Sequence, residues 1–143
     1  MKTAQAVSGS STAVVPPGWT GRAPKMEVIN GITVPPEPAP SINNATLAGV
    51  DVNNNGVRDD IERLVAQKWP KNFADGISVA KATQIAILQN ASIIDEPLQK
   101  SSFCALALNK IDSNAIMPSI LNTEDRYRAY MQNIGLSKIY QCD

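Results

Sequence analysis

The spacing of apolar residues divides the chain near residue 58. Beyond that point, apolar residues recur every three to four positions, which is typical of helices that bury one face. Pro70 ends the first predicted helix. Thr123 is a good N-cap for the last predicted helix, and Gly135 ends that helix. The predicted helices cover about 58–68, about 72–93, the stretch that follows Asp95-Glu96-Pro97, and about 123–135.

The first 47 residues differ in composition from the rest of the chain, because seven of the ten prolines lie before residue 41. Within this arm, Asn30-Gly31 separates Val28-Ile29 from Ile32-Thr33-Val34, which predicts a β-hairpin near 26–34 with a type I′ turn. An isolated hairpin is only marginally stable in water. We therefore expect it to pack on the helical body or to pair its open edge with another chain.

Together these patterns predict a mainly α fold. It would be a small three- to four-helix body with an extended N-terminal arm that contains a short β-hairpin. Residues 1–47 would form the Pro-rich arm, and residues 48–143 a loop followed by the helical domain.

Residues 51–62, DVNNNGVRDDIE, match the ligand spacing of a calcium loop. Such a loop needs oxygen donors at positions 1, 3, 5, 7, 9 and 12, with glycine at position 6. The donors here would be Asp51, Asn53, Asn55, the backbone carbonyl of Val57, Asp59 and Glu62. An all-oxygen shell that ends in a bidentate glutamate favours Ca²⁺ over zinc, copper or magnesium. The simpler alternative is a solvated Asx-turn that caps a helix, but it would explain only one or two of these positions.

This stretch, about 49–69, resembles the EF-hand loop, and more closely the truncated, dockerin-like loops of bacterial exported proteins. The resemblance implies a bound calcium ion and an exported protein, but no enzymatic activity. Three features depart from the pattern. Pro38, Pro40 and Gly49 leave no entering helix, Arg58 stands where paired EF-hands place an aliphatic residue, and no second loop follows.

The chain has two cysteines and no histidine. The absence of histidine excludes His-based catalytic triads and His-ligated zinc. We expect Cys104 and Cys142 to form a disulfide, which indicates an oxidising compartment; the alternative is two unrelated buried thiols. Because the first 15 residues are too polar for the apolar part of a signal peptide, an exported protein would correspond to a mature form. The expected location is extracellular, at the cell surface or periplasmic.

The charge balance excludes several partners. Lys+Arg and Asp+Glu each total 13, and no basic stripe or long apolar run occurs, so neither nucleic acid nor a membrane span is expected. We expect a non-enzymatic, calcium-stabilised structural or interaction module. It could self-associate through residues 1–47, with Val14-Val15 and the hairpin pairing with a neighbour in a surface filament. The alternatives are a small secreted or periplasmic hydrolase with two carboxylates in a pocket outside the loop, and a periplasmic binding module with an apolar groove.

Overall fold

The computed structural model of the chain describes residues 25–135 and 138–143. Its fold is mainly α with a short two-stranded hairpin, which confirms the fold class expected from the sequence. The elements follow in the order β1 (Glu27–Ile29), β2 (Ile32–Val34), α1 (Pro40–Asn43), α2 (Asp59–Lys68), η1 (Pro70–Asn72), α3 (Phe73–Leu88), η2 (Ala91–Ile93), α4 (Glu96–Ala107), α5 (Ser113–Ile120) and α6 (Glu124–Asn133).

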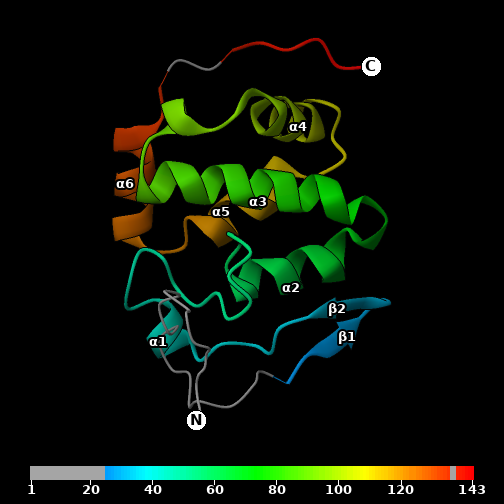
Figure 1. Cartoon of the computed structure of the whole chain (residues 1–143), viewed down its shortest axis with the longest axis vertical. Coiled ribbons are helices and arrows are strands. Elements are labelled where there is room, and N and C mark those ends of the chain that lie inside the picture. The colour runs from blue at the N-terminus through cyan, green and yellow to red at the C-terminus, as the bar shows by residue number, and fades with distance from the viewer. Residues whose placement is uncertain (1–24, 136–137) are drawn as a thin grey trace, which may run out of the picture.

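Helix α3 is the centre of the body, and α2, α4, α5 and α6 all pack against it (Figure 1). The buried core consists of aliphatic residues from α2, α3, α4 and α5 and from two connections, namely Val57, Ile61, Val65, Val79, Ala80, Ile87, Ala105, Ile111, Ile116 and Ile120. Gly76 lets α2 and α3 approach closely, because a Cβ at this position would overlap the side chain of Val65. Helix α2 buries Ile61 and Val65 of the apolar stripe predicted for it. The stripe predicted for the last helix is not buried, because Tyr127 and Met131 of α6 are exposed.

The predicted helix starts are confirmed where a side chain caps the helix. The Asp95 carboxylate accepts a hydrogen bond from the Leu98 N–H at 2.9 Å, and the Thr123 hydroxyl accepts from the Arg126 N–H at 3.1 Å. The second predicted helix, 72–93, is shorter than expected, because α3 ends at Leu88 and the chain turns before η2.

Helix α5 was not predicted, because it is short and contains Pro118. It forms because Asp112 caps its start and because Ile116 and Ile120 are buried in the core. Helix α1 likewise interrupts the arm that we expected to be extended. Pro40 stands at the start of α1, where its missing N–H costs nothing.

The predicted hairpin is present. Its antiparallel register pairs Glu27 with Val34, Val28 with Thr33 and Ile29 with Ile32. Asn30 and Gly31 have φ values of +50° and +81°, as a type I′ turn requires.

The hairpin lies on α2 of its own chain (Figure 1). The Asn30 side-chain amide donates to the carbonyls of Ala66 and Gln67 at 3.0 and 3.2 Å, near the C-terminal end of α2. Arg63 of α2 donates to Glu27, to Glu37 and to the carbonyl of Pro35. Val34 is fully buried, so this part of the arm belongs to the core. The other proposed pairing element, Val14-Val15, lies outside the described residues.

The C-terminal residues 138–143 lie against α4. Cys142 forms a disulfide with Cys104 of α4, with the two Cα atoms 5.6 Å apart. The Tyr140 hydroxyl donates to Gln99 at 3.0 Å, and its ring meets that of Phe103 edge-on with centroids 5.7 Å apart. These contacts fix the tail on the body. Within the described ranges, no helix has the length and apolar character needed to cross a membrane.

Candidate metal centre

The loop 51–62 forms a tight turn that leads directly into α2. Its first acid closes the turn, because the Asp51 carboxylate accepts hydrogen bonds from the N–H groups of Asn55 at 3.2 Å and Gly56 at 2.9 Å. Gly56 has a φ of +85°, which a glycine adopts without strain, and Asn54 also has a positive φ of +54°. The local sequence thus produces the turn through short-range contacts.

The two acids at the end of the loop are buried. Asp59 is 0% exposed and Glu62 is 5% exposed. The Asp59 carboxylate accepts from the Val52 N–H at 3.2 Å, and the Glu62 carboxylate accepts from the Asn55 side-chain amide at 2.7 Å. Among the residues that the structure describes, neither acid forms a salt bridge with a lysine or arginine. Both are therefore buried carboxylates without a positive partner.

The electrostatics of the loop favour a cation. Burial, together with the nearby charges of Asp51, Glu62 and Asp60, raises the pKa of Asp59 to about 7, against the opposing effect of the Val52 N–H. Burial also raises the pKa of Asp51 and of Glu62, and the charge of Asp51 adds to the increase at Glu62. A positive ion would offset these unfavourable interactions.

The predicted ligands differ in the contacts that they make within this turn. Asp51, Asn55, Asp59 and Glu62 take part in the hydrogen bonds described above, and the Asn53 side chain lowers the pKa of Glu62 against the larger effect of burial. Val57 is 1% exposed and packs in the core, so it anchors the loop to the body. Calcium accepts carboxylate, amide and carbonyl oxygens, so the residue types fit this ion.

The acids do not stand in a closed ligand shell. Over the described ranges, no group of three or more Asp, Glu or Cys side chains has an arrangement that could hold a metal ion. In this arrangement each acid instead accepts a hydrogen bond from a donor of the loop itself.

Arg58, at position 8 of the loop, ties the loop to α5. Its side chain is fully buried and donates to the Ile120 carbonyl at 2.7 Å and to the Ser119 carbonyl at 3.2 Å. It also makes a two-pronged salt bridge with Asp60, with both nitrogen–oxygen distances at 2.9 Å. A positive charge at the carbonyl end of a helix is favourable. The unusual residue at position 8 was the sequence signal for this contact.

Arg126 of α6 holds the segment that enters the loop, and the sequence analysis missed it. The side chain is 0% exposed. It donates to backbone carbonyls and side-chain amide oxygens of Asn43, Asn44, Thr46, Leu47 and Asn122. Burial, helped by the charge of Arg58, lowers the pKa of Arg126 to about 10, so it remains charged at neutral pH.

Gly49 allows both arginines to lie against the entering segment. Its φ is +68°, and a Cβ there would stand 2.7 Å from the Arg58 side chain and 2.9 Å from that of Arg126. The loop is thus fixed between the arm and the α5–α6 corner by two buried guanidinium groups.

Comparisons with known proteins add no further assignment. No protein-family model matches the chain, and neither the curated proteins nor the solved structures gave a significant match.

Proposed function

We propose that the chain is a calcium-stabilised structural or interaction module that holds one Ca²⁺ in the loop 51–62. The single observation that supports this most strongly is the burial of Asp59 and Glu62 beside Asp51 without a cationic partner in the described chain. Asp51, Asn53, Asn55, the Val57 carbonyl, Asp59 and Glu62 would hold the ion. The two positive charges of the ion would offset most of the negative charge of the three carboxylates.

The position of the loop suggests what the ion stabilises. The Asp59 N–H donates to the Val50 carbonyl at 2.8 Å, and the Val50 N–H donates to the Asn43 side chain at 2.9 Å. The loop therefore joins the entering segment to the start of α2. At an extracellular concentration of about 1 mM and a dissociation constant of about 10 μM, calcium would add roughly 2.7 kcal/mol to the free energy of unfolding.

Calorimetric titration of calcium into the metal-free protein tests this function. We expect one site per chain and a rise in melting temperature on binding. Glu62→Gln, which removes the charge at position 12, should weaken binding at least tenfold. Glu124→Gln is the matched control, because Glu124 is exposed on α6. The proposal is wrong if the wild-type protein gives neither heat nor a change in melting temperature at 1 mM calcium.

The interaction role and the exported location are part of the same proposal. The Cys104–Cys142 disulfide supports an oxidising compartment. Because residues 34–47 contribute to the core and to the contacts of Arg126, an assembly test must leave them in place. We therefore compare the whole chain with a chain that lacks residues 1–24, by size-exclusion chromatography with light scattering, in calcium and in EGTA. Assembly by both forms would rule out residues 1–24 as the contact.

A further inference from the structure

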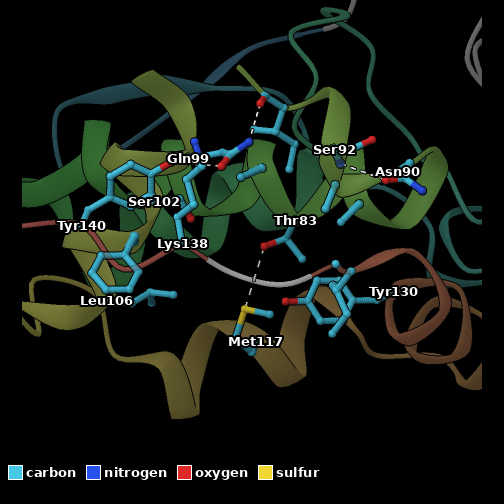
Figure 2. A pocket seen from close by; sticks show the side chains of 17 residues that line it. Thr83, Asn90, Ser92, Gln99, Ser102, Leu106, Met117, Tyr130, Lys138 and Tyr140 are labelled. Carbon is cyan, nitrogen blue, oxygen red and sulfur yellow. Dashed lines mark hydrogen bonds between the residues drawn. The ribbon is translucent and has the colours of Figure 1, made fainter. Parts of the chain in front are cut away.

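A second site lies on the opposite side of α3 from α2. Helices α4 and α6 both pack against α3 but make little contact with each other. The space between them is a pocket of about 530 Å³, with α5 at one end (Figure 2). Its floor on α3 is formed by Ala82, Thr83 and Ala86, whose small side chains leave the space empty. This volume falls within the range of small-molecule sites.

Most of the lining is apolar, with Phe103 and Leu106 from α4, Met117 from α5 and Ile134 after α6. The described lining contains no aspartate or glutamate, and its lysine, Lys138, pairs with Glu96 at 2.8 Å. A charged ligand would lose its hydration here without gaining a free counter-charge. The lining therefore favours an uncharged ligand.

Several polar groups of the pocket already have partners. Thr83 donates to the Val79 carbonyl at 2.7 Å, the Gln99 amide donates to the Ile94 carbonyl at 2.6 Å, and Asn90 accepts from the Ser92 N–H at 2.9 Å.

The Tyr130 hydroxyl is different. It points toward the middle of the pocket (Figure 2), and no residue of the described chain is its hydrogen-bond partner. Burial raises the pKa of Tyr130, so the hydroxyl keeps its proton and can donate.

We propose that this pocket binds a small uncharged molecule with an apolar ring system or chain and one acceptor oxygen, to which the Tyr130 hydroxyl donates. The pocket walls position the apolar part between α4 and α6, and the tail covers one end through Tyr140. The proposal does not depend on calcium binding, because its residues are separate from the loop 51–62.

Fluorescence titration with prodan, a neutral naphthalene ketone, tests the proposal on the full chain in 1 mM calcium. The expected result is saturable binding of one probe per chain with a blue shift of its emission. Ser102→Phe should abolish binding, because Ser102 lines the pocket. Ser101→Phe is the matched control, because Ser101, the neighbour of Ser102 on α4, is exposed and its substitution should leave binding unchanged.

Tyr130→Phe isolates the hydrogen bond. It should weaken prodan binding by roughly three- to tenfold, the usual worth of one hydrogen bond. Tyr127→Phe, an exposed position on the same helix, should have no effect. Circular dichroism of each variant checks that the fold is retained. Non-saturable binding, equal effects of the two serine variants, or full affinity in Tyr130→Phe would each overturn the proposal.

Discussion

Replacing Asp59 with asparagine should make the metal-free protein more stable at pH 8. Asparagine is nearly the same size and keeps an oxygen that can accept from the Val52 N–H. It removes a negative charge that is 0% exposed and lies near the charges of Asp51 and Glu62. In most proteins the loss of a buried carboxylate is destabilising, so an increase in stability is a sharp expectation.

The size of the effect follows from the pKa of Asp59, which burial raises from 3.8 to about 7. At about 1.4 kcal/mol for each pH unit, this difference corresponds to about 4 kcal/mol. The folded state binds this proton more tightly than the unfolded state does. The stabilising contribution is therefore complete below about pH 4 and is lost as the pH rises through 7.

Urea denaturation in calcium-free buffer between pH 4 and pH 8, followed by circular dichroism, measures this contribution. The wild-type free energy of unfolding should fall more steeply with pH than that of the Asp59→Asn variant. At pH 8 the variant should be more stable by up to about 4 kcal/mol, and near pH 4 the two proteins should be similar.

The neighbouring acid provides a control of opposite sign. Asp60→Asn removes the salt-bridge partner of the buried Arg58 and should destabilise the protein by roughly 1–3 kcal/mol. If Asp59→Asn is less stable than wild type at pH 8 without metal, or if the two pH profiles run parallel, the electrostatic argument for the loop is incorrect. Addition of 1 mM calcium should narrow the gap, because the wild-type loop binds the ion more tightly.

Three further predictions concern Arg126, Gly49 and the disulfide, and each can be checked by the same denaturation assay. Arg126→Met should cost roughly 3–5 kcal/mol, because it leaves buried oxygens without a donor, whereas the exposed Arg128→Met should cost under about 1 kcal/mol. Equal losses would contradict the role of the buried guanidinium. Gly49→Ala should destabilise by roughly 1–3 kcal/mol through its positive φ and the crowded Cβ, and Gly135→Ala, with open space around it, should change little. Cys142→Ser should lower the free energy of unfolding by about 4 kcal/mol in the chain-entropy model. A reductant should lower the free energy of unfolding of the wild-type protein by a similar amount. If neither change has an effect, the disulfide does not constrain the unfolded chain.

Local signals in the sequence were sufficient for much of the fold. The Asn30-Gly31 turn and the caps at Asp95 and Thr123 each depend on residues within three positions. The loop 51–62 is also local, because its turn is closed by contacts between Asp51 and Gly56. Such features are readable because their hydrogen bonds form between neighbours in the chain, whatever the tertiary structure does.

The tertiary structure decided everything that depends on distant partners. Nothing in the sequence distinguishes the buried Arg126 from the exposed Arg128 on the same helix, since the acceptors of Arg126 include residues about 80 positions away. Helix α5 likewise exists because the core buries Ile116 and Ile120 around an internal proline. The pocket between α4 and α6 is set by how far two helices separate over the alanines of α3. Burial of charge and the space between helices depend on packing across the whole chain, which local sequence does not specify.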